Sequence, residues 1–334
     1  MTYILRIAVL ALLLGSGGAL AQTQPGSPSG QNPTTRAVNE EQLLRELNRL
    51  DGRVSIPDRK SGMLEQPQGR EWRAIKEGWV PWIGGIAVLG MLLALAAFYL
   101  VKGRIRMEGG EGSGIKILRF NTFERFTHWL TASSFIVLGL SGLNYVFGKR
   151  LLMPLIGPDA FATFSQWGKY AHNYLAWPFM LGILFMMVVW LKDNIPNRVD
   201  WAWIKAGGGL FGNGHPHAWR FNAGQKMMFW IVMIGGLAMS VTGLMMMFPF
   251  TATDVNGMQT SQLIHAVIGV LFVAAILAHI YIGSIGMEGA YEAMGTGEVD
   301  LGWARRHHDL WVEQAQAKAE DAPRPANPRT VPAE

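Results

Sequence analysis

The sequence predicts an all-α membrane protein, built as a four-helix transmembrane bundle with one additional N-terminal transmembrane helix. About half of the 334 residues are apolar and only 16% are charged. The apolar residues gather in runs of about 20, the length of helix that crosses the ~30 Å hydrocarbon layer of a bilayer. Tryptophan and tyrosine lie near the ends of these runs, as expected at the two membrane surfaces. The runs cover residues 81–101, 126–147, 172–191, 227–249 and 262–286.

The chain before the first run is predicted to be exported. Residues 1–21 hold an early cation, an apolar stretch and the small residues Ala19-Leu20-Ala21, a pattern typical of a signal peptide with its cleavage site. An uncleaved signal anchor is the alternative, and it places the following chain on the same side. We expect residues 22–79 to form a periplasmic segment, partly disordered, with a short amphipathic helix over 39–50.

The distribution of lysine and arginine predicts the orientation of the helices. Both cations are frequent before the second run and between the third and fourth, whereas the 250–261 loop has none and the 148–171 loop has three. Cation-rich loops stay in the cytoplasm, so we expect a multi-pass protein of the bacterial inner membrane with a cytoplasmic C-terminus. The predicted parts are a signal peptide at 1–21, a periplasmic segment at 22–79, an extra transmembrane helix at 80–102, the four-helix bundle at 115–290, and a cytoplasmic C-terminal helix and tail at 291–334.

The composition excludes several kinds of redox centre. The chain has no cysteine, which excludes disulfides, iron–sulfur ligation and covalently attached c-type haem. The net charge of +5 arises from cations that flank apolar runs, so it indicates membrane topology and not a nucleic-acid partner. Histidine is therefore the main candidate for holding a redox metal.

Four of the eight histidines fall in the predicted transmembrane helices: His128, His172, His265 and His279. A polar ring without a partner in hydrocarbon costs several kcal/mol, so four such rings need a common explanation. His265 and His279 are 14 residues apart on one helix, which separates them by ~21 Å along the axis and only ~40° around it. One helix thus presents two rings at two depths.

The depths of the other two rings predict two pairs. His172 opens its helix from the periplasmic side and should lie level with His265, while His128 opens its helix from the cytoplasmic side and should lie level with His279. A pair of imidazoles from two helices is how b-type haem is held without covalent attachment. We therefore expect two haem b groups with these four histidines as metal ligands. Zinc or copper is the alternative metal, but two ligands at each level make an incomplete site.

Four segments give a resemblance to a known family: Arg125-Phe126-Thr127-His128-Trp129, Asn194-Ile195-Pro196, the run from Phe221 to Trp230, and Arg305-Arg306-His307-His308. Together they resemble the cytochrome b gamma subunit of membrane-bound respiratory formate dehydrogenase, over about residues 115–315. The resemblance implies a membrane anchor for an iron–sulfur beta subunit and a molybdenum or tungsten alpha subunit. It also implies electron transfer from the periplasmic iron–sulfur subunit to quinone at the cytoplasmic side.

The chain itself is then not an enzyme, because nothing in it could oxidise formate. The alternatives are a cytochrome b subunit of a hydrogenase or another respiratory dehydrogenase, and a transporter or scaffold with structural histidines. The N-terminal segment and the extra helix are departures from the short, four-helix members of the family.

A quinone site is expected just before the fourth run, at Asn222, Gly224 and Gln225, where an amide and an accessible glycine backbone could bind a quinone carbonyl. The alternative is that Asn222 only caps the helix. Lys169, Arg119, Arg125 and Lys226 are candidate partners of haem propionates, with topology-setting cations as the equally weighted alternative. We expect His215 and His217 to be solvated loop residues and His307 and His308 to form a surface or partner-contact patch.

Overall fold

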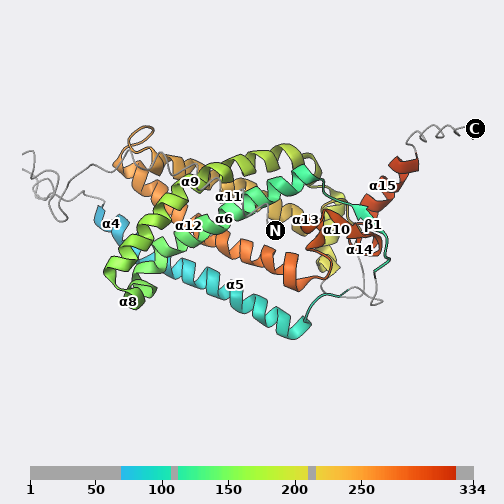
Figure 1. The fold of residues 1–334 in the computed structure, drawn as a ribbon, viewed down its shortest axis with the longest axis horizontal. Coiled ribbons are helices and arrows are strands. Elements are labelled where there is room, and N and C mark those ends of the chain that lie inside the picture. Colours follow the sequence, from blue (N-terminus) through green and yellow to red (C-terminus); the bar gives the residue numbers. More distant parts are fainter. Residues whose placement is uncertain (1–68, 107–111, 210–215, 321–334) are drawn as a thin grey trace, which may run out of the picture. The chain divides into compact units, whose positions relative to one another are not determined.

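The computed structural model describes residues 69–106, 112–209 and 216–320 (Figure 1). From Arg70 onward the chain forms one compact unit. The predicted signal peptide and the helix expected over 39–50 lie outside the described residues. So does His215.

Five helical stretches are long and apolar enough to cross a membrane, which confirms the predicted all-α membrane fold. The first combines α4 (Gly69–Ala74), a π-helical turn (Ile75–Trp79) and α5 (Val80–Lys102). The second is α6 (Thr122–Leu143), which continues through a π-helical turn (Asn144–Gly148) into α7 (Lys149–Leu151). The others are α9 (Pro158–Trp190), α11 (Ala223–Met247) and α12 (Val255–Tyr281), the last extended by a π-helical turn (Ile282–Gly286).

The loop expected over 148–171 is wrong for most of its length, because α8 (Met153–Ile156) is followed directly by α9. Pro158 in the first turn and Asp159 beside it are helix-start signals, and the polar residues after them are compatible with a helix. Hydropathy alone therefore placed the start of this helix 14 residues late. With 33 residues α9 is about 50 Å long, which exceeds the ~30 Å hydrocarbon layer.

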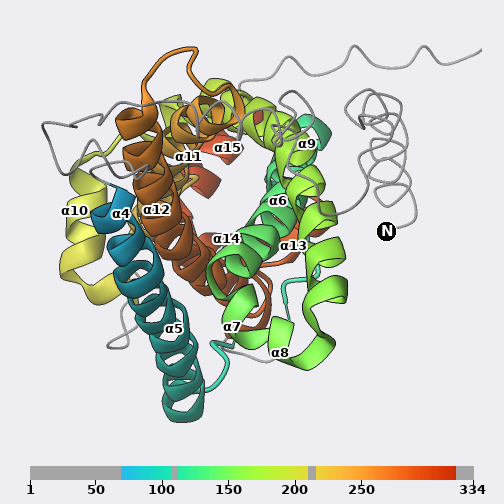
Figure 2. The ribbon, with the colours of Figure 1, turned by 90° about the vertical axis from the view of Figure 1, so that its left-hand side faces the viewer.

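The four bundle helices pack as two adjacent pairs, seen end-on in Figure 2. Helix α6 lies against α9, α11 lies against α12, and contacts between α9 and α11 and between α6 and α12 close the bundle. Helix α5 lies outside it, beside α12. Gly84 makes this close approach possible, because a Cβ there would lie 3.0 Å from side-chain atoms of both Phe147 and Val270.

One end of the bundle is covered by the short elements, and we call it the capped end. Strands β1 (Lys116–Leu118) and β2 (Glu298–Asp300) pair antiparallel, with Ile117 opposite Val299. Around them lie α10 (Arg198–Lys205), α13 (Glu292–Gly295), α14 (Leu301–His307) and α15 (Asp309–Glu320). The C-terminal helix expected within 291–334 is present as α14 and α15, and the pairing of β2 with β1 attaches it to the end of the bundle.

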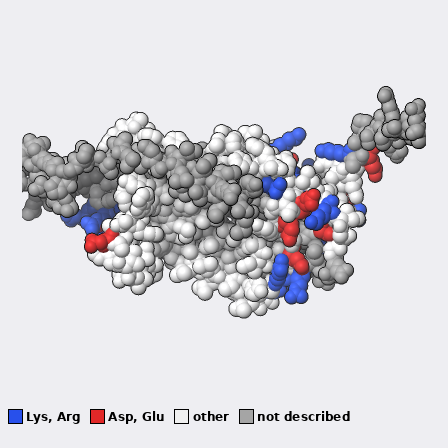
Figure 3. Space-filling model, in the orientation of Figure 1, with Lys and Arg blue, Asp and Glu red and all other residues white. Residues whose placement is uncertain are grey.

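The charged side chains lie mainly at the two ends of the bundle. On the face drawn in Figure 3, the Lys, Arg, Asp and Glu residues of the described chain gather at the two ends of the helices, most of them at the capped end, and leave an uncharged surface between. Burial of a charge in hydrocarbon is costly, so this uncharged surface marks the part of the bundle that contacts lipid.

The packing of α5 leads to a prediction. Replacing Gly84 with Leu should lower the melting temperature of the detergent-solubilised protein, because the side chain has no room against Phe147 and Val270; overpacking of this kind costs about 1–3 kcal/mol. Gly85→Leu is the matched control, since a Cβ at Gly85 meets nothing within 4 Å. Equal melting temperatures for the two variants would contradict the docking of α5 through Gly84.

Candidate functional site

The four intramembrane histidines face one another in two pairs. The ring centres of His172 (α9) and His265 (α12) are 6.1 Å apart, and those of His128 (α6) and His279 (α12) are also 6.1 Å apart. The second pair lies toward the capped end, where the neighbouring Trp129 donates a hydrogen bond to the carbonyl of Met294. The structure thus brings the rings together in the two pairs that their depths predicted.

The spacing within each pair fits an iron held between two imidazoles. With roughly 2 Å for each metal–nitrogen bond, two rings on opposite sides of a metal have centres about 6 Å apart. Each pair supplies two nitrogens, whereas a structural zinc site takes four ligands. In the described ranges, no group of three or more His, Cys, Asp or Glu side chains is placed to hold a metal ion. The donor set therefore suits haem better than zinc or copper.

Two hydroxyl groups orient the rings of the first pair. Nδ1 of His172 lies 2.8 Å from Oγ of Ser141 on α6, and Nδ1 of His265 lies 2.9 Å from Oγ1 of Thr242 on α11. Each hydroxyl also lies 2.7 Å from a backbone carbonyl of its own helix, that of Val137 for Ser141 and that of Ala238 for Thr242. A carbonyl only accepts, so the single hydroxyl proton goes to it and the ring Nδ1–H donates to the hydroxyl oxygen. Nε2 of each ring is then free to bind a metal.

Sequence reasoning missed these two hydroxyls, although a signal was present. Ser141 is followed by Gly142 and Thr242 by Gly243, and both glycines face the same rings. A Cβ at Gly243 would lie 3.3 Å from Cε1 of His265, so glycine gives this ring room beside α11. A hydroxyl residue followed by glycine, on the two helices that carry no histidine at this level, is the shared pattern.

A layer of phenylalanines separates the two pairs. Phe135 lies 4.9 Å from Phe272 and 6.2 Å from Phe179, between ring centres. Each lies seven residues after a histidine, and Phe272 is midway between His265 and His279. Seven residues are about two helical turns, so the rings project from the same faces as the histidines and fill the middle of the bundle.

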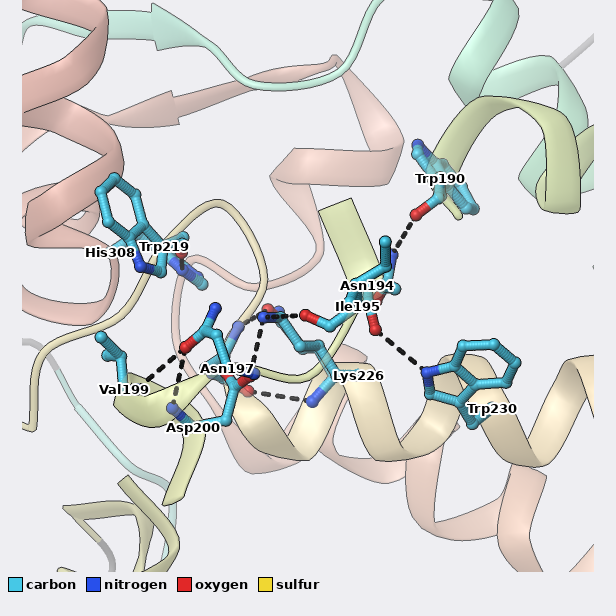
Figure 4. Close-up of polar contacts among 12 residues, drawn as sticks. Trp190, Asn194, Ile195, Asn197, Val199, Asp200, Trp219, Lys226, Trp230 and His308 are labelled. Carbon is cyan, nitrogen blue, oxygen red and sulfur yellow. Dashed lines mark hydrogen bonds and ion pairs between the residues drawn. The ribbon is translucent and has the colours of Figure 1, made fainter. Parts of the chain in front are cut away.

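Two of the segments that carry the family resemblance, Asn194-Ile195-Pro196 and the run from Phe221 to Trp230, meet at the capped end (Figure 4). Lys226 of α11 donates to Asp200 of α10 at 2.8 Å and to the carbonyl of Ile195 at 3.1 Å, and Trp230 donates to the carbonyl of Asn194 at 3.0 Å. The Lys226 and Asp200 side chains are only 5% and 11% exposed. Lys226 is therefore held in a buried ion pair, and the structure does not leave it free for a haem propionate.

The expectation of a surface patch at His308 is wrong, because this residue is 1% exposed. Its Nδ1–H donates to the carbonyl of Trp219 at 2.7 Å, so Nε2 accepts from Nη2 of Arg119 at 2.8 Å. Burial, and then the charge of Arg119, hold the pKa of His308 well below 6.5. Burial and the charge of Arg220 lower the pKa of Arg119 to about 9, which still leaves it protonated at neutral pH. The neutral ring is thus an acceptor for a buried guanidinium.

A family model described as prokaryotic cytochrome b561 matches residues 119–297. This range contains the four paired histidines together with α10 and α13, and it ends just before β2. The chain belongs to the prokaryotic cytochrome b561 family. Membership implies haem b as the cofactor, and the paired rings described above are the groups in this chain that fit it.

Curated relatives refine the comparison. The chain is 32% identical over 212 residues to the cytochrome b556(Fdn) subunit of nitrate-inducible formate dehydrogenase from Escherichia coli K12, covering 61% of this chain and 95% of that one. It is 27% identical over 208 residues to the cytochrome b556(fdo) subunit of formate dehydrogenase from the same strain, again covering 61% and 95%. A formate dehydrogenase cytochrome b556 subunit of Haemophilus influenzae is 25% identical over 213 residues, covering 62% and 87%. The predicted resemblance is confirmed, and this cytochrome b is an electron-transfer subunit and not a catalytic one.

The residues expected to bind quinone form the start of α11 in this cytochrome b. Oδ1 of Asn222 accepts from the backbone N–H of Gln225 at 2.9 Å, and Oε1 of Gln225 accepts from the N–H of Asn222 at 3.1 Å and from Arg119 at 3.3 Å. This capping box is the alternative weighed from the sequence. It uses only the amide oxygens, and within the described residues neither amide NH2 group donates a hydrogen bond.

Gly224 is covered by a side chain that sequence reasoning did not consider. A Cβ at Gly224 would lie 3.2 Å from Cη2 of Trp203 on α10, and the same indole lies against Gly208. The glycine therefore allows Trp203 to pack on the start of α11. Its backbone is less accessible than the sequence suggested.

The other candidates for propionate contacts differ in their surroundings. Arg125 donates to the carbonyl of Gly295 at 2.9 Å, whereas Lys169 is exposed on α9. His217 is exposed, as expected, and its ring pairs with Asp309, which raises the pKa of His217. Among the predicted cations, Lys169 is thus the one whose side chain the structure leaves in an exposed position.

Stability of the capped end should fall on acidification because of His308. The pKa of His308 is depressed in the folded protein and returns to about 6.5 on unfolding. Below this pH the unfolded chain therefore binds a proton at His308 that the folded chain does not bind. The free energy of unfolding should fall by up to about 1.4 kcal/mol per pH unit below 6.5 and show no such dependence above it. Melting temperatures between pH 7 and 5 measure this, with His308→Gln reducing the dependence and His217→Asn, at the exposed ring, retaining it. Equal slopes in wild type and His308→Gln would contradict the account.

Proposed function

We propose that this chain is the membrane-anchoring cytochrome b subunit of a formate dehydrogenase complex, carrying electrons through two b haems to quinone. The proposal rests on two pairs of imidazole rings that lie at two levels of one bundle. In each pair the ring centres are 6.1 Å apart. The likeness to formate dehydrogenase cytochrome b subunits supports the choice of complex.

The two pairs of histidines are the proposed haem ligands. His172 and His265 hold one haem through Nε2, and His128 and His279 hold the other. Bound haem supplies a one-electron carrier, and its potential depends on the ligands and on their hydrogen bonds. Two carriers at two depths form a path across the bilayer, with the layer of Phe135, Phe179 and Phe272 between them.

The capped end is assigned to the cytoplasm. Cations before and at the start of α6, and from the end of α9 to the start of α11, gather there, which supports this orientation by the positive-inside rule. They include Lys116, Arg119, Arg125, Lys192, Arg198, Lys205, Arg220 and Lys226. The His172–His265 pair then faces the periplasm, residues 22–79 are periplasmic, and the protein is a multi-pass protein of the bacterial inner membrane.

Electrons enter on the periplasmic side from an iron–sulfur beta subunit, which receives them from a molybdenum or tungsten alpha subunit. Quinone is reduced on the cytoplasmic side, beside the His128–His279 pair. Because protons for quinone come from the cytoplasm, turnover moves charge across the membrane, and each charge moved against ~100 mV stores ~2.3 kcal/mol.

The amide nitrogens of Asn222 and Gln225 are the donors in this chain that suit a quinone carbonyl. Their oxygens hold the capping box, which fixes both amides in place, and their NH2 groups remain available. Gly224 contributes by letting Trp203 pack beside them. The site is therefore built on the first turn of α11.

A cytochrome b subunit of a hydrogenase or another respiratory dehydrogenase is the second candidate. The matched family is described only as prokaryotic cytochrome b561, which names no catalytic partner. Affinity purification of the intact complex separates the two. An iron–sulfur subunit and a formate-oxidising subunit should co-purify, whereas a nickel hydrogenase subunit in their place would support the second candidate.

The ligand assignment predicts the effect of single substitutions on α12. His265→Ala and His279→Ala should each reduce the haem-to-protein ratio from two to one, and the remaining haem should differ between the variants in a redox titration. The difference arises because the two rings lie at different levels of the bundle. Two intact haems in either variant would contradict the assignment.

The quinone assignment predicts the effect of isosteric changes at the start of α11. Asn222→Asp and Gln225→Glu keep the oxygens of the capping box and remove the amide donors. Each should raise the KM for quinone by roughly 5- to 30-fold, the factor that one or two kcal/mol represents, while both haems stay reducible by formate through the intact complex. Asn121→Asp is the matched control, because Asn121 caps α6 with the same box. Unchanged quinone kinetics in both α11 variants would reject this site.

A further inference from the structure

The two histidine pairs differ in what holds the second nitrogen of each ring. In the pair of His172 and His265, each Nδ1–H donates to a hydroxyl oxygen, that of Ser141 at 2.8 Å and that of Thr242 at 2.9 Å, and a backbone carbonyl of the same helix, that of Leu138 or Met239, lies beside each ring as a further acceptor. In the pair of His128 and His279, Nδ1 of His128 is buried without a partner among the described residues. No hydroxyl within the described chain is hydrogen-bonded to His279 either.

The hydroxyls are themselves held in place. Ser141 donates to the carbonyl of Val137 and Thr242 to that of Ala238, both at 2.7 Å. A histidine that binds metal through Nε2 carries its ring proton on Nδ1, so Nδ1–H donates to the hydroxyl oxygen while the hydroxyl proton goes to the carbonyl. Both rings of this pair thus keep one tautomer, with Nδ1 protonated and Nε2 free.

A hydrogen bond from Nδ1–H to an acceptor makes the imidazole more basic. A more basic ligand favours the ferric over the ferrous state of the iron it binds, which lowers the midpoint potential. Two such bonds act on one side of the bundle and neither acts on the other. These hydrogen bonds alone therefore make the potentials of the two haems differ, apart from any effect of charges near the haems.

We propose that Ser141 and Thr242 are positioning residues that lower the potential of the haem held by His172 and His265 relative to the haem held by His128 and His279. The inference rests on the ligand assignment proposed above. A lower potential at the first haem favours electron transfer from the haem of His172 and His265 to the haem of His128 and His279. This direction runs from the uncapped to the capped end of the bundle. The proposal assigns to two helices without a ligand at this level, α6 and α11, a part in setting the redox properties.

The test is a redox titration of the purified, haem-loaded complex carrying Ser141→Ala and Thr242→Val, singly and together. At a fixed ambient potential, the ratio of reduced to oxidised haem should rise severalfold at one haem and stay constant at the other, a tenfold rise being about 59 mV for one electron. The double variant should show the largest rise. The His265→Ala variant, which retains only the second haem, identifies which component of the titration shifts.

Matched controls exist on the same helices. Ser134 on α6 donates to the carbonyl of Leu130 at 2.7 Å, and Ser240 on α11 donates to that of Gly236 at 2.6 Å. Within the described residues neither hydroxyl is bonded to a histidine, so Ser134→Ala and Ser240→Ala should leave both potentials unchanged. Ser141→Thr and Thr242→Ser retain the acceptor and should keep the wild-type titration.

The outcomes separate this inference from the ligand assignment. Two haems in every variant with unchanged potentials would overturn the inference and leave the ligands in place. A downward shift, or equal shifts in the Ser134 and Ser240 controls, would also overturn it. Loss of one haem from the alanine and valine variants would assign the two hydroxyls to haem binding and likewise overturn the inference. Absence of haem from the wild-type protein would instead reject the proposed function itself.

Discussion

A polar ring inside a bilayer has to find its partners within the protein, because hydrocarbon offers none. In this chain the constraint applies to four histidines, and the arrangement of the bundle follows from it. Helix α12 carries two of the rings, and α6 and α9 each place one ring opposite them. Helices α6 and α11 add the hydroxyls that hold the first pair. All four bundle helices thus meet at the level of His172 and His265.

At the capped end, buried charged side chains likewise find their hydrogen-bond and ion-pair partners within the protein. Arg119, Lys226 and Glu124 are almost fully buried, and each is bonded to groups from other segments: Arg119 to His308, Lys226 to Asp200, and Glu124 to Arg220. Breaking a buried pair by removing one partner is costly. Lys226 and His308 stand in the segments that carry the family resemblance, and Glu124 and Arg220 directly precede two of these segments. These segments fix the ends of α6 and α11 relative to the strands and to the C-terminal helices.

Much of the fold was predictable because hydrophobic runs and intramembrane histidines are strong local signals. The 14-residue spacing of His265 and His279 predicted one helix with two facing rings, and the structure has this arrangement. The start of α9 was missed because its first 14 residues are polar enough to resemble a loop. The β1–β2 pair and the burial of His308 were missed because both depend on contacts about 180 residues apart in the chain, which no local pattern records. Asn222 and Gln225 show the opposite case, in which a local capping signal was present and the structure has that box.

The hydroxyls of Ser141 and Thr242 explain why helix geometry alone gives an incomplete description of the site. Spacing places a ring at a depth and on a face, but it does not decide which nitrogen carries the proton. That depends on an acceptor from a neighbouring helix, and such acceptors are common in membrane helices, where serine and threonine bond to their own backbone. The sequence therefore predicted which rings pair, and only the packing of α6 on α9 and of α11 on α12 reveals what orients them.

The central claim is that each of the two pairs holds one haem b. The most direct measurement is the haem content of the purified wild-type chain, by pyridine haemochrome against protein concentration, together with its dithionite-reduced minus oxidised spectrum. The account predicts two b haems per chain and a b-type difference spectrum. One haem per chain, or no b-type signal, would contradict it.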